Sequence, residues 1–323
     1  MKYFLYPITW LFSVIVYIRN ALYDWELLPS VSSALPIISV GNIQAGGTGK
    51  TPFVIALSKQ LIANNIKPLI ITRGYKRNTT HQFFLNDFEQ YSAQEVGDEP
   101  YYIKQVLKDV PIIVDHNKKN AVKAANELKN IDCIILDDGF QSRYIYKDID
   151  IVLTSFSQIN NFSLMPFGSF REPISSLRRA HFIYKTKESN SGENNLKIEF
   201  ILTLRGIALG KPDKILGQGN NVAFCGIANP EYFITSLKRI GIHVEQEIKF
   251  ENHAKYDAKK YQKLYKVDVG ETDYWNKVRF ITTSKDYVKL EEDFLSEYAV
   301  YVLKMNFVLD DNRLLETIQK LIK

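Results

Sequence analysis

The feature that most limits what this chain can fold into is a glycine-rich segment that leads into a lysine and a threonine. In order, its residues are Gly46, Gly47, Thr48, Gly49, Lys50 and Thr51. An apolar run at 36–40 precedes the segment, and apolar residues recur at helical spacing after it. This order of strand, loop and helix turns backbone N–H groups toward phosphate at a helix N-terminus. It predicts a nucleotide-binding loop, with a chance cluster of glycines as the alternative.

The polar residues of the segment indicate ATP and Mg²⁺ as cofactors. Lys50 is expected to reach the β- and γ-phosphates, and the Thr51 hydroxyl is expected to bind Mg²⁺. Gln44 is a departure, because the strict spacing of such loops has glycine at that position.

Length and composition favour two domains with apolar cores. The chain has 323 residues, of which 46% are hydrophobic, and a domain typically takes about 100–200 residues. The net charge of +5 comes from dispersed Lys and Arg without a long basic run, so nucleic acid is not an expected partner. Cys133 and Cys225 lie in apolar runs, which indicates buried thiols and no disulfide.

Strand-like and helix-like segments alternate along the chain, which is typical of an α/β fold with a parallel sheet covered by helices. In the first half, strands are expected at 36–40, 67–72, 111–114, 131–136 and 150–154, with helices at 98–108 and 120–129. A second alternation has strands at 221–225, 278–282 and 298–303 and a helix at 230–240. The polar region 185–220 is expected to contain the boundary between two domains.

The N-terminal segment 3–18 has no charged residue and ends at Arg19. A helix needs about 20 apolar residues to cross a bilayer, so the segment is too short to span one. No small-residue cleavage site of a signal peptide follows it. Its aromatic residues, among them Trp10 and Tyr17, favour a helix lying in the membrane surface. The alternative is a helix packed on the protein's own core.

Acidic residues follow the strand expected at 131–136. Asp137 and Asp138 are placed to hold Mg²⁺ opposite Thr51, and the alternative is a solvated turn. Asp98 and Glu99 precede a helix, so a helix cap and a catalytic role both remain open.

Two arginines and one histidine are further candidates. Arg73 follows the strand expected at 67–72, where a guanidinium can bind phosphate. Arg171 lies in a segment that fits either a substrate-phosphate contact or a simple turn. His253 by itself indicates little.

Taken in order, the motifs of this chain resemble those of the tetraacyldisaccharide 4′-kinases of lipid A synthesis. After an apolar start, the matching segments are 40–52, 73–75, 97–100, 137–141, 166–173, 226–230, the region of His253, and 283–286. The resemblance covers nearly the whole chain. It implies a P-loop NTPase-like parallel sheet covered by helices, with a second, smaller α/β domain joined by a hinge.

The implied boundaries are 1–28 for a membrane-surface helix, 29–205 for the kinase domain and 206–323 for the smaller domain. The implied location is the cytoplasmic face of the bacterial inner membrane, where the protein would be peripheral or monotopic. The implied partners are a lipid A disaccharide precursor and the membrane surface, without an obligate protein partner.

The implied reaction moves the γ-phosphate of ATP to the 4′-hydroxyl of a tetraacyldisaccharide 1-phosphate, which forms lipid IVA. Lys50 and Thr51 would hold nucleotide and Mg²⁺, together with Asp137 and Asp138. Asp98 would act as general base, paired with His253 when the hinge closes. The residues expected at the substrate are Asn42, Arg73, Glu99, Gln141 and Arg171.

Several positions depart from the family pattern. Asn252 and Ala254 flank His253 where the family commonly has Asp-His-His, so the assignment of His253 rests on one histidine. Ser142 stands where histidine is usual, and Tyr287 stands where alanine is usual.

Two other classes of nucleotide-binding protein compete with this interpretation. A membrane-surface switch ATPase would have its signature lysine at position 45, where this chain has Ala45. A GTPase would have an Asn-Lys-x-Asp guanine-binding motif, which the Ser284-Lys-Asp286 segment lacks. The kinase interpretation is therefore favoured.

Overall fold

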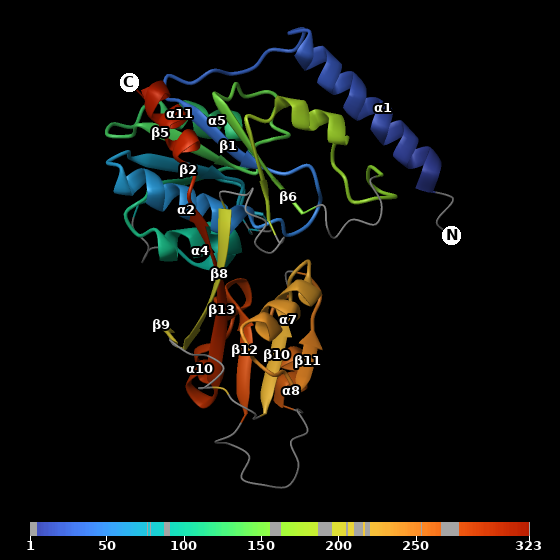
Figure 1. Ribbon diagram of the computed structural model, residues 1–323, viewed down its shortest axis with the longest axis vertical. Coiled ribbons are helices and arrows are strands. Elements are labelled where there is room, and N and C mark those ends of the chain that lie inside the picture. Colours follow the sequence, from blue (N-terminus) through green and yellow to red (C-terminus); the bar gives the residue numbers. More distant parts are fainter. Residues whose placement is uncertain are drawn as a thin grey trace. The chain divides into compact units, whose positions relative to one another are not determined.

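The computed structural model describes residues 5–75, 77, 79–86, 91–155, 163–186, 196–204, 206–209, 216, 220–252, 254–265 and 278–322. The chain divides into two compact units (Figure 1). Unit 1 comprises Met1–Ile198 and Phe307–Lys323, and unit 2 comprises Glu199–Asn306. Both ends of unit 2 therefore continue into unit 1.

Unit 1 is built on a seven-stranded sheet in the order β3-β4-β2-β5-β1-β6-β7. The strands are β1 (Ile37–Gly41), β2 (Pro68–Thr72), β3 (Phe83–Leu85), β4 (Ile112–Val114), β5 (Cys133–Asp137), β6 (Ile149–Thr154) and β7 (Phe182–Lys185). All neighbouring pairs are parallel except β3 with β4. The central strands are buried along their whole length because helices cover a parallel sheet, and this explains their continuous apolar runs.

The helices of unit 1 come from both ends of the chain. They are α1 (Leu5–Asp24), α2 (Lys50–Ala63), α3 (Ala93–Val96), α4 (Asp98–Val106), α5 (Lys118–Ala125), the 3₁₀ helix η4 (Ile174–Arg179) and α11 (Asn312–Ile322). The returning C-terminal segment is fixed by contacts with the first part of the chain. The Tyr184 hydroxyl donates to Asp311 at 2.7 Å, and the Phe53 and Phe307 rings lie 6.3 Å apart.

Unit 2 has a six-stranded sheet in the order β11-β10-β12-β13-β8-β9. Its strands are β8 (Leu196–Leu204), β9 (Ile207–Ala208), β10 (Asn221–Cys225), β11 (Gln246–Lys249), β12 (Arg279–Thr283) and β13 (Ala299–Leu309). Its helices are α7 (Pro230–Arg239), α8 (Ala258–Tyr265), α9 (Ser284–Tyr287) and α10 (Glu292–Glu297). Buried aromatic rings, with Phe224 and Phe280 among them, form one of its two apolar clusters.

The α/β fold and the parallel sheet expected from the sequence are confirmed. The chain divides between Ile198 and Glu199, inside the region 185–220 that was expected to contain the domain boundary, and that region also contains β8 and β9. Residues 307–323, which were expected in the smaller domain, cluster with unit 1, as does the helix that was expected as a separate segment at 1–28.

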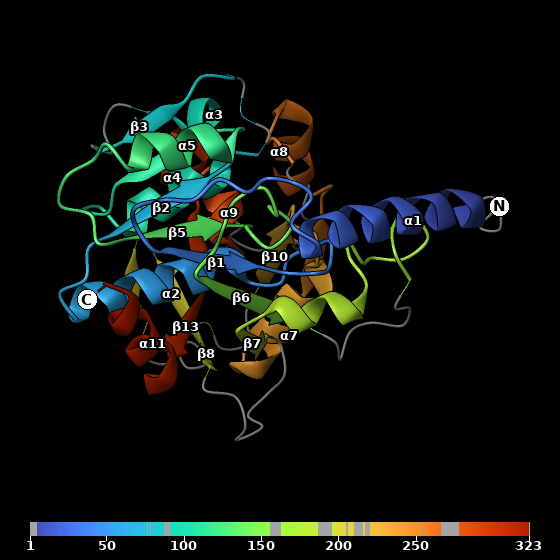
Figure 2. The ribbon, with the colours of Figure 1, turned by 90° about the horizontal axis from the view of Figure 1, so that it is seen from above.

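Helix α1 has one packed face and one exposed apolar face. Val16 is buried, and Phe12 packs against an apolar cluster of unit 1 that includes Ile43 and Phe140. The exposed apolar side chains of the helix are Tyr6, Ile8, Trp10, Leu11, Ile15, Tyr17 and Ile18. In Figure 2 the helix extends outward beside the segment that contains η4. Among the described residues, no helix has the length and apolar character needed to cross a membrane.

Candidate functional site

The glycine loop connects the carboxyl end of β1 to the first turn of α2. Gly49 precedes this helix with φ 81° and Gly46 has φ 114°, and both values lie in the left-handed region that favours glycine. Thr48 anchors the loop, because Asn42 Nδ2 donates to its Oγ1 at 2.8 Å and Thr186 Oγ1 donates to its carbonyl at 2.8 Å. Backbone N–H groups at this helix N-terminus suit an anion.

Neighbouring segments support the first half of the loop. Ala45 N donates to Ser169 O at 2.7 Å. Gln44 is buried, and its Oε1 accepts from Ser155 N and Ser155 Oγ, each at 3.2 Å. The side chain that departs from the strict loop pattern thus ties the loop to the end of β6.

Asp137 lies at the carboxyl end of β5 and is in register with Val40 of β1. Its Oδ2 accepts from Thr72 Oγ1 at 2.9 Å, whereas its buried Oδ1 has no hydrogen-bond partner among the described residues. Burial, together with the nearby charges of Glu99 and Asp138, raises the pKa of Asp137 to about 6. The nearby charges of Lys118 and Lys50 lower this pKa, but they do not outweigh burial and the acidic neighbours.

Asp138 already has cationic partners. Its carboxylate lies 3.4 Å from Lys50 Nζ and 3.0 Å from Arg171 Nη1. Burial alone would raise the pKa of Asp138, but Lys50 and Arg171 hold it well below its usual value. Its φ of 50° places the residue in a tight turn directly after β5.

Lys118 is a site residue that sequence reasoning missed. Its fully buried Nζ donates to the carbonyl oxygens of Asp137 at 2.5 Å and Asp138 at 2.8 Å. Burial lowers the pKa of Lys118 to about 8. The lysine thereby fixes the turn that carries both carboxylates. Its only signal in the sequence is its place at the start of a helix that follows a strand.

The segments of Arg73 and Asp98 pack closely together. A Cβ on Gly74 would lie 2.5 Å from Val96 O, and a Cβ on Gly97 would lie 3.1 Å from Gly74 Cα. Gly97 occupies the N-cap position of α4, so Asp98 is the first helical residue and not the cap. The charge of Glu99, the next residue, contributes to the raised pKa of Asp137.

The structure places most of the expected site residues around the loop in unit 1. Gln141 Nε2 donates to Asn42 O at 2.8 Å, and the Asn42 side chain is fully buried. Arg73 is exposed at the end of β2. His253 lies outside the described residues, so its pairing with Asp98 stays a prediction.

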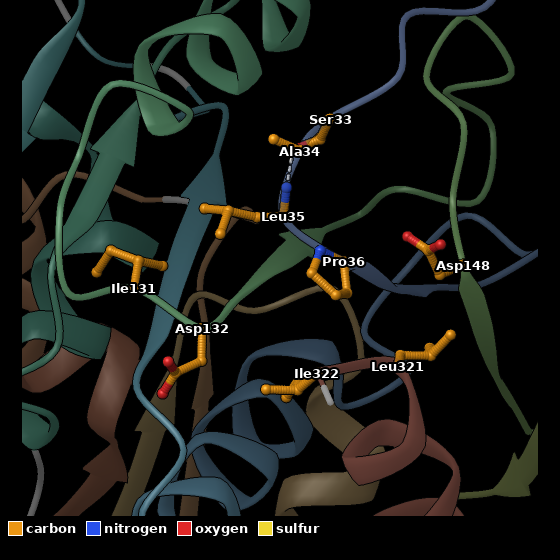
Figure 3. A pocket seen from close by; sticks show the side chains of 9 residues that line it. All are labelled: Ser33, Ala34, Leu35, Pro36, Ile131, Asp132, Asp148, Leu321 and Ile322. Atoms are coloured by element: carbon orange, nitrogen blue, oxygen red, sulfur yellow. Dashed lines mark hydrogen bonds between the residues drawn. The ribbon is translucent and has the colours of Figure 1, made fainter.

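A pocket lies at the opposite, amino end of the sheet, and its lining side chains differ from those around the glycine loop (Figure 3). Two of its lining carboxylates are already bonded to backbone. Asp132 accepts from Lys67 N, and Asp148 accepts from Ile37 N, each at 2.7 Å. We therefore assign the functional site to the loop and not to this pocket.

A glycine loop at a helix N-terminus, with aspartates at the end of the adjacent parallel strand, defines the class of P-loop nucleotide-binding proteins. The family model described as "Tetraacyldisaccharide-1-P 4'-kinase" matches residues 1–323. The chain belongs to this family, as the resemblance predicted.

Similar proteins agree with this assignment. A tetraacyldisaccharide 4'-kinase of Aquifex aeolicus is 31% identical over 297 residues, which cover 89% of both chains. One of Koribacter versatilis is 32% identical over 319 residues, which cover 94% of both. The crystal structure of the "apo" form of LpxK from Aquifex aeolicus in complex with ATP superposes with a TM-score of 0.76 at 27% identity. That match covers 100% of this chain and 99% of the other.

Proposed function

We propose that the protein transfers the γ-phosphate of ATP to the 4′-hydroxyl of a tetraacyldisaccharide 1-phosphate. Family membership supports the reaction. The observation that carries it is the pairing of Lys50 with Asp138 beneath the glycine loop, next to the unpartnered oxygen of Asp137. This arrangement suits a site that exchanges internal charge pairs for the charges of a nucleotide.

ATP binds along the loop in this proposal. The backbone N–H groups of residues 46–51 cradle the phosphates, and Lys50 leaves Asp138 to contact the β- and γ-phosphates. Thr48 supports the loop, because its hydroxyl and its carbonyl both accept hydrogen bonds that hold the loop in place.

The residues present also fit Mg²⁺. The buried Oδ1 of Asp137 has no hydrogen-bond partner within the described part of the chain, as expected of an oxygen that binds a cation when the site is occupied. Thr51 and Asp137 would hold the ion, with Asp138 beside them. Among the described residues, no three His, Cys, Asp or Glu side chains are grouped so that they could hold a metal ion. Mg²⁺ commonly keeps water and phosphate oxygens as ligands beside one or two carboxylates. Bound there, Mg²⁺ would neutralise charge that develops on the phosphates.

Asp98 is the proposed general base. It accepts the proton of the 4′-hydroxyl as that oxygen bonds to the γ-phosphorus and ADP leaves. The resemblance supplies His253 as the residue that orients it. Arg73, Glu99 and Arg171 are the proposed substrate contacts, whereas Asn42 and Gln141 more directly support the loop.

We also propose that α1 lies on the cytoplasmic surface of the bacterial inner membrane, where the lipid substrate would be presented. The exposed apolar face of the helix supports this placement, since Trp10 is 69% and Tyr17 is 73% exposed. Aromatic side chains of this kind favour the boundary between headgroups and acyl chains.

The test is transfer from radiolabelled ATP to tetraacyldisaccharide 1-phosphate in mixed micelles. Asp98→Asn should lower kcat by about 10²- to 10⁴-fold with ATP affinity unchanged, because only the proton acceptor is lost. The matched control is Asp109→Asn, an exposed aspartate just after the same helix, which should retain wild-type kcat. His253→Ala should slow transfer, and adding it to Asp98→Asn should have little further effect if the two residues act as one unit.

Wild-type protein that transfers no label to the lipid would contradict the proposed reaction. Loss of ATP binding in Asp98→Asn would instead indicate that Asp98 contacts the nucleotide or has a structural role.

A further inference from the structure

One buried carboxylate, that of Glu172, joins α1 to the segment that carries Arg171. Its side chain is fully buried. From α1, Asn20 Nδ2 donates to Glu172 Oε2 at 2.9 Å and Arg19 Nη2 donates to Oε1 at 3.2 Å. Arg179 Nη2 at the end of η4 donates to Oε2 at 2.8 Å. Three donors from two distant parts of the chain therefore converge on a single side chain.

These contacts keep Glu172 ionised. Burial raises the pKa of a carboxyl group, but the charges and hydrogen bonds of Arg179, Arg19 and Asn20 hold that of Glu172 below its usual value. A buried charge whose partners are removed is strongly unfavourable, so the three donors and the carboxylate are expected to hold one geometry.

The residue immediately before Glu172 reaches the phosphate loop. Arg171 Nη1 donates to both carboxylate oxygens of Asp138, at 3.0 and 3.2 Å. Arg171 N donates to Ile43 O at 2.8 Å, which ties the same residue to the start of the loop. The guanidinium of Arg179 lies 4.5 Å from the ring centroid of Phe140, two residues beyond Asp138. The partners of Glu172 thus touch the segment of the aspartates as well.

Other contacts of α1 fall on the same segment. Thr9 Oγ1 accepts from Phe167 N at 3.2 Å, and the Tyr6 and Phe167 rings stack at 4.4 Å. The inner face of α1 is therefore a support for the chain that leads to Arg171.

We propose that Glu172 is a positioning residue for phosphoryl transfer, which holds Arg171 against Asp138, and that Arg19 and Asn20 of α1 complete its support. The helix is then part of the framework of the site in addition to its outward apolar face. The inference rests on the proposed function, because it assigns Arg171 and Asp138 to the site of transfer.

The test is a double-mutant cycle in the transfer assay, with activity normalised to folded protein by circular dichroism. Glu172→Gln keeps the shape of the side chain but replaces one acceptor by a donor that faces Arg179 and Asn20. It should lower kcat/KM by about ten- to a hundredfold, the range for loss of a hydrogen bond to a charged group. The same change in an Arg171→Ala background should have little further effect, because residues that act through one another are non-additive.

Arg178→Ala is the matched control. It removes the ion pair of a 72% exposed arginine with Asp24 at the end of α1, and leaves Glu172 untouched. Exposed pairs contribute little, so kcat/KM should stay within about twofold of wild type. Hydrogen exchange of residues 164–171 should rise in Glu172→Gln and stay unchanged in Arg178→Ala.

Wild-type activity of Glu172→Gln or of Arg171→Ala would overturn the inference. So would losses that multiply in the double variant, since a merely structural defect acts independently of Arg171. If Glu172→Gln does not fold, the double-mutant cycle with Arg171→Ala is carried out with Arg19→Gln, which leaves Glu172 in place. Wild-type kcat/KM in Arg19→Gln would overturn the proposed role of α1. Inactive wild-type protein, in contrast, would refute the proposed function itself.

Discussion

Replacing Asp137 by asparagine should make the ligand-free protein more stable relative to wild type as the pH rises from 4.5 to 7.5, while it impairs phosphoryl transfer. The Asp137 pKa is raised from 3.8 to about 6, mainly by burial and then by the charges of Glu99 and Asp138. Because the folded-state pKa lies above the unfolded-state value, ionisation of Asp137 opposes folding. This unfavourable contribution is absent below about pH 3.8 and complete above about pH 6. At one pKa unit per 1.36 kcal/mol, it amounts to roughly 3 kcal/mol.

Asparagine removes the charge and keeps an oxygen that accepts from Thr72. Its amide nitrogen takes the place of the unpartnered Oδ1, which adds a constant desolvation penalty of about 1–3 kcal/mol. This desolvation penalty does not change with pH, so it does not affect how the stability difference between Asp137→Asn and wild type varies with pH. Between pH 4.5 and 7.5, the stability of Asp137→Asn relative to wild type should therefore rise by about 2 kcal/mol.

The measurement is urea unfolding at the two pH values, without nucleotide and with a chelator present. Asp138→Asn is the matched control, because the pKa of Asp138 is lowered by Lys50 and Arg171 despite its burial. Its ionised form supports folding above the unfolded-state pKa, so this variant should be less stable than wild type at both pH values. A stability difference between Asp137→Asn and wild type that does not change with pH would refute the reasoning.

Two further predictions concern the loop and α1. Lys50→Ala and Thr51→Ala should each abolish transfer, because the first removes the positive charge that contacts the phosphates and the second removes a ligand of the metal ion. Wild-type turnover in both variants would contradict the proposed nucleotide site. The double variant Trp10→Ser, Tyr17→Ser should bind anionic vesicles more weakly in a flotation assay and keep its thermal stability, because both side chains are exposed. Unchanged vesicle binding would count against the membrane-facing role of α1, and Lys59→Ser on the exposed side of α2 is the control that should bind as wild type does.

Features that depend on local order along the chain were predictable. The strand before Gly46, the helix after Thr51 and the aspartates after β5 all follow from neighbouring residues, because an apolar run, a glycine turn and a helix start are encoded within a few positions. The register of Val40 with Asp137 then brings loop and carboxylates together, as expected for adjacent parallel strands.

Features that depend on distant partners were not predictable. The residues near Glu172 in the sequence gave no indication of its partners Arg19 and Asn20, which lie more than 150 positions away. Nothing in the sequence around Lys118 indicated that its ammonium group would donate hydrogen bonds to the carbonyl oxygens of Asp137 and Asp138. Strand β8 was missed because 185–220 was taken as polar throughout, although the residues from Leu196 to Phe200 alternate apolar and polar as a half-buried strand does.

The return of residues 307–322 to unit 1 has a consequence for the order in which the protein can mature on the ribosome. Unit 2 is synthesised between two parts of unit 1, so the nucleotide-binding unit stays unfinished until nearly the whole chain has emerged. Until then, Tyr184 lacks Asp311 and Phe53 lacks Phe307. A nascent chain halted before position 307 would thus expose apolar surface around α2, and chaperones that bind such surfaces would have their longest opportunity late in translation.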